Sequence, residues 1–119
     1  MAYMSFEDLE VWKKGCRLAV RTFEVFDGCK RFGLRDQITR SALSIPSNIA
    51  EGCDRNSAGD FVRFLNIANG SAAEFRTQLY IASELKYLDE EIFKEMLNEV
   101  KGISAMLFGL IRSIKERAK

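Results

Sequence analysis

The segment RSALSIPSNIAEGCDR, from Arg40 to Arg55, decides the fold of this 119-residue chain. It contains the only proline of the sequence, Pro46, inside a pattern that otherwise predicts a helix, because Ala42, Ile45 and Ile49 recur at spacings of three and four. A proline inside a helix removes a backbone donor and clashes with the preceding turn, which costs about 3 kcal/mol. The apolar period nevertheless continues in phase through Pro46, so we expect one continuous helix that is kinked at the proline.

Apolar residues at helical spacing predict four helices, at about 6–27, 33–53, 58–86 and 90–116. We expect Ser5, Ser57 and Asp89 to be N-caps, and Gly28 to end the first helix in the left-handed conformation. The apolar stripe expected for the first helix consists of Leu9, Trp12, Cys16, Ala19, Phe23 and Phe26. The stripe of the second is Leu34, Ile38, Ala42, Ile45 and Ile49, and that of the third is Phe61, Leu65, Ala68, Ala72, Phe75, Leu79 and Ala82. The stripe of the fourth is Phe93, Met96, Val100, Ile103, Leu107, Leu110 and Ile114. Four long helices with short connections predict an all-α, up-down-up-down bundle that forms a single domain over residues 1–119.

The composition excludes several classes of function. The chain has no histidine, which excludes Ser-His-Asp and Cys-His catalysis and His-ligated metal. Its three cysteines are odd in number and form no CxxC pair, which favours reduced thiols in the cytoplasm. No secretion signal and no apolar stretch of about 20 residues is present. We therefore expect a cytoplasmic protein with no cofactor, metal, membrane association or evident small-molecule substrate.

Polar residues follow the second and third predicted helices where a plain bundle would carry leucine. The polar stripe of the second helix is Gln37, Ser41, Ser44, Asn48 and Glu51. With Pro46, the candidate residues of what we call the polar seam are Gln37, Arg40, Ser44, Asn48 and Glu51 on one helix, and Ser71, Glu74 and Gln78 on the other. Antiparallel packing would bring Gln37 and Arg40 near Glu74, and Ser44 near Asn66 and Ser71. A catalytic or metal-binding pair of Glu51 and Glu74 is one interpretation. A hydrogen-bonded network that fixes the helix register is the other, and the absence of a Glu-x-x-His motif favours it.

Basic residues mark the first and last helices, which are neighbours in a four-helix bundle. The candidate nucleic-acid-binding residues are Lys13, Lys14, Arg17 and Arg21, followed by Arg112, Lys115 and Arg117. The net charge of +1 does not by itself demand a polyanionic partner. A solvated helix face is therefore the alternative interpretation.

Two other kinds of site remain as alternatives. Apolar residues off the main stripes offer a protein-interaction surface: Tyr3, Val11, Phe32, Tyr80, Tyr87, Phe108 and Ile111. We expect Phe108 and Ile111 to widen the core instead. Cys53 beside Asp54 and Arg55 is the candidate for a reactive thiol, but a helix C-terminus raises a thiol pKa. We therefore expect no catalytic residues and no enzymatic activity.

The run QITRSALSIPSNIAEG, Gln37 to Gly52, resembles the signature of a family of small bacterial four-helix bundles. The family includes proteins encoded in intervening sequences of 23S rRNA genes, formerly labelled ribosomal proteins. The segments LEVWKKG (Leu9 to Gly15), FVRFLNIANGSAAEFRTQL (Phe61 to Leu79) and LKYL (Leu85 to Leu88) resemble the same family in the same order. The resemblance implies a left-handed up-down bundle that assembles as a ring-like homopentamer and has no established enzymatic activity.

The resemblance also suggests a partner. A related protein, the accessory protein of diversity-generating retroelements, is pentameric, strongly basic, and binds nucleic acid and a reverse transcriptase, whereas this chain carries a net charge of only +1. The residues shared with the family pattern look structural: Pro46, Asn48, Glu51, Gly52, Ser71, Glu74 and Gln78. We therefore expect a non-enzymatic oligomer that binds RNA or a ribonucleoprotein. A protein-interaction or structural oligomer with no nucleic-acid role is the alternative.

Overall fold

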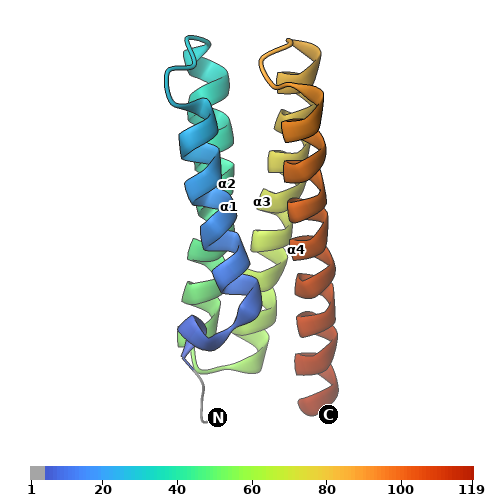
Figure 1. The fold of residues 1–119 in the computed structure, drawn as a ribbon. Coiled ribbons are helices and arrows are strands. Elements are labelled where there is room, and N and C mark those ends of the chain that lie inside the picture. The colour runs from blue at the N-terminus through green and yellow to red at the C-terminus, as the bar shows by residue number, and fades with distance from the viewer. Residues whose placement is uncertain (1–4) are drawn as a thin grey trace.

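Four long helices stand side by side in a computed structural model that describes residues 5–119 (Figure 1). A short 3-10 turn comes first, and the elements are η1 (Phe6–Asp8), α1 (Glu10–Phe26), α2 (Phe32–Asp54), α3 (Ala58–Glu84) and α4 (Glu90–Arg117). Successive helices run in opposite directions through short connections, in a molecule of 48 × 20 × 19 Å. The predicted all-α, up-down arrangement is confirmed. Within the described residues, no helix combines the length and apolarity that crossing a membrane requires.

The helix ends follow the predicted capping residues, with one exception. Ser57 accepts a hydrogen bond from the Asp60 backbone N–H at 3.1 Å, and Asp89 accepts one from the Ile92 N–H at 2.8 Å. Gly28 has the expected positive φ of 80° after α1. Ser5, in contrast, caps η1 rather than α1, because the chain becomes extended at Leu9. The first α-helix therefore begins at Glu10, later than predicted.

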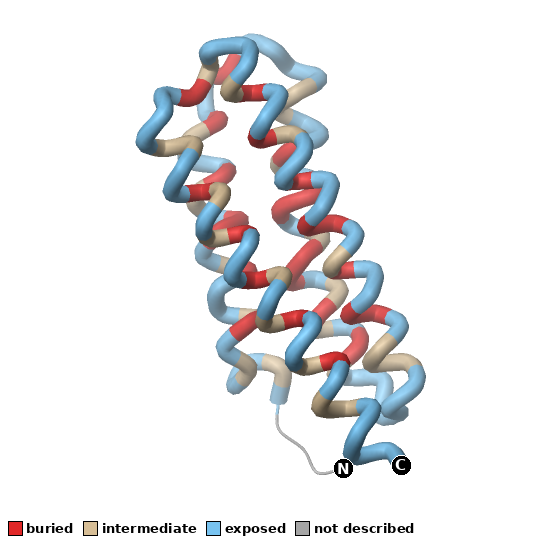
Figure 2. The backbone as a smooth tube through the Cα atoms, turned by 90° about the vertical axis from the view of Figure 1, so that its right-hand side faces the viewer, coloured by how far each residue is buried: buried red, intermediate tan, exposed pale blue. Residues whose placement is uncertain are grey.

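The core lies along the inner faces of all four helices (Figure 2). The stripes predicted for α2, α3 and α4 supply most of it. The fully buried side chains from these three helices include Ile38, Ile45, Ile49, Leu65, Phe75, Leu79, Met96, Val100, Ile103 and Leu107. Since these residues recur every three or four positions, each helix turns one continuous apolar face inward.

The stripe predicted for α1 was partly wrong. Val11 and Leu18 are buried, whereas Phe23 is 49% exposed, so the inner face is rotated from the expected one. Thr22 is also fully buried, and its hydroxyl donates a hydrogen bond to the Leu18 carbonyl at 2.7 Å. This bond satisfies the hydroxyl within its own helix and lets a polar residue occupy a core position.

Helix α2 passes through Pro46 without a break, as predicted. Pro46 is buried against α1, where a Cβ atom built on Gly15 would lie 3.4 Å from the Pro46 Cβ. The pyrrolidine ring therefore lies close to the backbone of α1 at Gly15. The packing of the ring offsets part of the cost of the missing helical hydrogen bond. The kink at Pro46 and the left-handed twist of the bundle stay predictions.

The apolar residues expected outside the main stripes differ from one another in how far they are buried. Val11 and Ile111 are buried, so Ile111 widens the core as expected, whereas the same expectation was wrong for Phe108, which is 58% exposed. Phe32 and Tyr80 are exposed. Tyr87 stacks on Phe26 and donates a hydrogen bond to the Val25 carbonyl at 2.9 Å. Tyr3 lies outside the described residues.

Candidate functional site

The polar seam between α2 and α3 satisfies its own hydrogen bonds. Ser41 donates from Oγ to Oε1 of Gln78 at 2.6 Å, and the Ser44 and Ser71 hydroxyls lie 2.8 Å apart. Asn48 donates from Nδ2 to the Ser44 hydroxyl at 2.9 Å and to the Ser44 carbonyl at 2.8 Å. Ser41 belongs to the polar stripe predicted for this helix, three residues before Ser44. The seam is therefore a set of short contacts between small polar side chains.

The longer polar residues of the seam do not form the expected network. Gln37, Arg40 and Glu74 are exposed, and none of them forms a hydrogen bond or ion pair within residues 5–119. The reason is geometric: Gln78 pairs with Ser41, one turn beyond Gln37, and Glu74 points outward at the rim of the seam. Glu51 is also exposed and pairs with Arg55 of its own helix at 3.0 Å.

Glu51 and Glu74 belong to no larger group of metal-ligating side chains among the described residues. Across the described part of the chain, no group of three or more carboxylate and cysteine side chains is placed to hold a metal ion. The Cys53 thiol is half-buried, and burial, followed by the nearby Asp54 carboxylate, raises its pKa. A raised pKa keeps the thiol protonated and weakly nucleophilic.

Glycine allows α2 and α3 to approach closely at one end of the seam. Gly52 is buried, and a Cβ atom added there would lie 2.6 Å from the Phe64 Cβ and 3.3 Å from the Phe61 carbonyl oxygen. Real Cβ atoms do not approach other atoms to 2.6 Å, so only glycine fits at this position.

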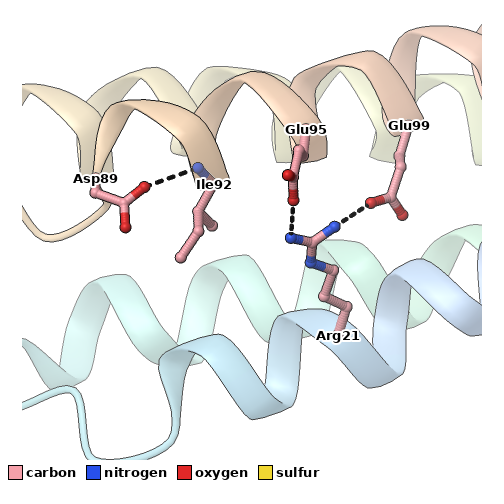
Figure 3. Close-up of polar contacts among 5 residues, drawn as sticks. All are labelled: Arg21, Asp89, Ile92, Glu95 and Glu99. Carbon is pink, nitrogen blue, oxygen red and sulfur yellow. Dashed lines mark hydrogen bonds and ion pairs between the residues drawn. The ribbon is translucent and has the colours of Figure 1, made fainter.

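Two ion pairs connect helices α1 and α4. The Arg21 guanidinium reaches from α1 between two carboxylates of α4: Nη1 donates to Glu99 at 2.7 Å and Nη2 donates to Glu95 (Figure 3). The hydrogen bond to Glu95, assisted by Glu99, raises the pKa of Arg21. Two carboxylates therefore neutralise Arg21, which removes it from the set of cations free to bind a phosphate.

Two of the predicted cations lie together beside this bridge. Lys14 and Arg17 are exposed and line a groove of about 310 Å³ between α1 and α4. Neither forms an ion pair with any residue between 5 and 119, whereas Lys13 lies 3.9 Å from Glu10. The opposite wall of the groove comes from α4 and includes Asn98, Glu99, Gly102, Ile103 and Met106. Sequence reasoning did not find this wall.

The basic residues at the end of α4 do not join this group. Arg21, in the second half of α1, pairs with Glu95 and Glu99 near the start of α4, and the last turns of α4 extend past the start of α1 (Figure 1). Lys115 lines a second groove beside the start of α3, and Arg117 donates to Ser113 at 3.1 Å. Arg112 is exposed. The seven predicted cations thus divide into two separate regions.

Comparison with known proteins places the chain among relatives of unknown function. The 23S rRNA-intervening sequence protein family matches residues 7–109, which include the seam and the α1–α4 groove and stop before Arg112. A solved structure from Bacteroides thetaiotaomicron, of a protein with unknown function from the S23 ribosomal protein family, superposes with a TM-score of 0.80 at 30% identity. The match covers 85% of this chain and 97% of that chain. A search of curated proteins finds no match.

The family match spans most of the chain and agrees with the helical arrangement, and nothing in either comparison points to catalysis. The chain therefore belongs to the 23S rRNA-intervening sequence protein family.

Proposed function

We propose that this protein is a non-enzymatic homo-oligomer that binds RNA, alone or within a ribonucleoprotein, through Lys14 and Arg17. The observation that carries the proposal is the exposure of these two cations side by side without ion-pair partners, next to an arginine that is neutralised. Unpaired cations release the counterions of a phosphate backbone on binding, and this release favours association at low salt.

A single chain offers few phosphate contacts, so the proposal includes assembly. Repetition of a modest cationic group in a symmetric ring raises the affinity for a long polyanion through effective concentration. The resemblance described above implies a homopentamer. Support for an interface comes from large apolar side chains that are at least 40% exposed on the outside of the bundle: Val20, Phe23, Phe32, Leu43, Ile67, Tyr80, Ile81, Leu85 and Phe108. Covering such side chains in an oligomer would remove apolar surface from water.

Fluorescence anisotropy with a labelled RNA hairpin tests the phosphate contacts. The variant Lys14→Gln/Arg17→Gln should bind at least tenfold more weakly and should reduce the slope of log K against log salt by about 2. The matched control is Lys30→Gln/Arg31→Gln, which removes the same charge from the exposed α1–α2 connection. Equal losses in the two variants would show that only net charge matters and would refute a site at Lys14 and Arg17.

The exposed apolar residues also favour a second candidate function, a structural or protein-interaction oligomer with no nucleic-acid role. Light scattering tests assembly separately from RNA binding, since a pentamer has five times the 13.6 kDa mass of one chain. A pentamer that binds no RNA at low salt would favour this second function. A monomer at micromolar concentration would contradict assembly in both.

A further inference from the structure

The groove between α1 and α4 is lined on the α4 side by a residue without a side chain, Gly102. A Cβ atom built on Gly102 meets no atom within 4 Å, so the space above it is open. The groove volume of about 310 Å³ falls at the lower end of the range for small-ligand pockets, roughly 300–1,000 Å³. Its size suits one flat ring system and excludes a helical duplex.

The two walls of the groove differ in chemistry. Lys14 and Arg17 supply positive charge from α1, and Ile103 and Met106 supply an apolar floor from α4. A methionine thioether makes favourable contacts with aromatic rings. A ligand that matches both walls carries a negative group next to a flat apolar ring, as a nucleotide does.

One end of the groove is polar, and the edge of a bound ring would lie there. Glu99 accepts the Arg21 hydrogen bond through Oε1, and its Oε2 atom forms no hydrogen bond within the described chain. Figure 3 shows this second oxygen turned away from Arg21. Asn98 lines the same groove and supplies an amide. A carboxylate accepts hydrogen bonds and repels phosphate, so the donor edge of a base belongs at Glu99 and the phosphate belongs at Lys14 and Arg17.

We infer that the α1–α4 groove binds one unpaired base of a single-stranded RNA, with guanine as the best fit. The inference rests on the proposed RNA binding and adds to it the form of RNA that is recognised. Sequence-dependent RNA recognition targets unstacked bases, whose edges are free to form hydrogen bonds. Guanine is the base whose Watson–Crick edge carries two adjacent donors, N1–H and N2–H, which match a carboxylate.

The test compares two leucine substitutions on one helix. Gly102→Leu fills the groove, and Gly109→Leu is the matched control, because a Cβ at either glycine of α4 meets nothing within 4 Å and only Gly102 lines the groove. The probes are a labelled oligouridine of about ten nucleotides with one central guanosine, the same length of uridine alone, and an RNA hairpin. Circular dichroism and light scattering of each variant verify its fold and assembly.

The wild-type protein should bind the guanosine-containing strand more tightly than uridine alone. Gly102→Leu should weaken binding to that strand about tenfold and leave the hairpin affinity unchanged, while Gly109→Leu should change neither. Glu99→Gln keeps the groove open and should abolish the preference for guanosine. Equal effects of both leucine variants, or a preference that survives Glu99→Gln, would overturn the base site and leave the phosphate contacts in place. Failure of every RNA to bind at low salt would instead overturn the proposed function itself.

Discussion

Two pairs of helices hold this bundle together in contrasting ways. The α2–α3 pair uses small residues, with Gly52 directly against Phe64 and with serine hydroxyls in contact across the seam. The α1–α4 pair uses long charged side chains, with Arg21 between Glu95 and Glu99, and a groove remains beside the bridge. Where the backbones approach closely, the small polar side chains Ser41, Ser44, Asn48 and Ser71 form hydrogen bonds within the protein. Where long side chains span a gap, space and charge remain available for a ligand.

The largest expected loss of stability comes from separating α2 and α3. Gly52→Ala places a Cβ atom 2.6 Å from the Phe64 Cβ, so α2 and α3 must move apart, and we expect a loss of about 2 to 3 kcal/mol in unfolding free energy. Gly70→Ala is the control, because its Cβ meets nothing within 4 Å and alanine favours a helix by about 1 kcal/mol. Urea denaturation measures both. A neutral Gly52→Ala would contradict the tight approach of α2 and α3.

The next effect measures the polar contact in the same pair. Ser71→Ala leaves the Ser44 hydroxyl without its partner across the seam and should cost about 1 kcal/mol. A double-mutant cycle with Ser44→Ala isolates the coupling between the two hydroxyls. Zero coupling energy would show that the 2.8 Å contact contributes nothing to stability.

A third change tests the end of the bundle where α1 meets the α3–α4 connection. Tyr87→Phe removes the hydrogen bond to the Val25 carbonyl and should cost about 1 kcal/mol at pH 7. Burial, and then Cys29 and Asp27, raise the pKa of Tyr87. The folded state therefore holds the phenol proton more tightly, and this contribution is present below the unfolded pKa of about 10 and is lost as the pH rises above it. The variant should lose less stability than the wild type between neutral and strongly alkaline pH; parallel pH profiles would contradict this.

A smaller effect is expected at the charged pair. Arg21→Met removes both ion pairs between α1 and α4, and partly exposed ion pairs contribute little, so the loss should be about 0.5 kcal/mol. Screening in 1 M KCl should abolish most of this difference, whereas the effect of Ser71→Ala should be insensitive to salt. A loss that persists in high salt would place the stabilisation in packing of the Arg21 stem rather than in charge.

The smallest expected change in stability tests whether Glu74 belongs to the hydrogen-bonded part of the polar seam. Glu74 lies at the rim without a hydrogen bond or ion pair within residues 5–119, so Glu74→Ala should change stability by less than about 0.5 kcal/mol in a dissociated subunit. A thermal melt of the monomeric protein provides the measurement. A sharp drop in Tm would restore the network first expected around this residue.

The sequence was most informative where apolar residues are large and regular. The stripes of α3 and α4, such as Phe75 and Leu79 or Met96 and Val100, are buried as predicted, because no polar residue interrupts them. The stripe of α1 was harder to identify, since Thr22 is buried through a hydrogen bond to its own helix while Phe23 faces outward. Neither the burial of Thr22 nor the exposure of Phe23 follows from residue type alone.

The candidate site was predictable on one side only. Lys14 and Arg17 follow from charge spacing along one helix. Their facing residues, such as Gly102 and Met106, depend on the register of α1 against α4, in which Arg21 pairs with carboxylates 74 and 78 positions away in the sequence. Spacing within a helix cannot reveal a pairing of that kind.

The open glycines of α4 also affect how this helix moves. Gly102 and Gly109 both lie inside α4, and each weakens a helix by roughly 1 kcal/mol relative to alanine, with no packing contact at either position that requires glycine. This part of the groove wall therefore has a lower intrinsic helix stability than the earlier, glycine-free turns of α4. The amide hydrogens between the two glycines should exchange with solvent faster than those of the earlier turns. A ligand that contacts Ile103 and Met106 would slow that exchange. Slower amide exchange in α4 would therefore report that the groove is occupied.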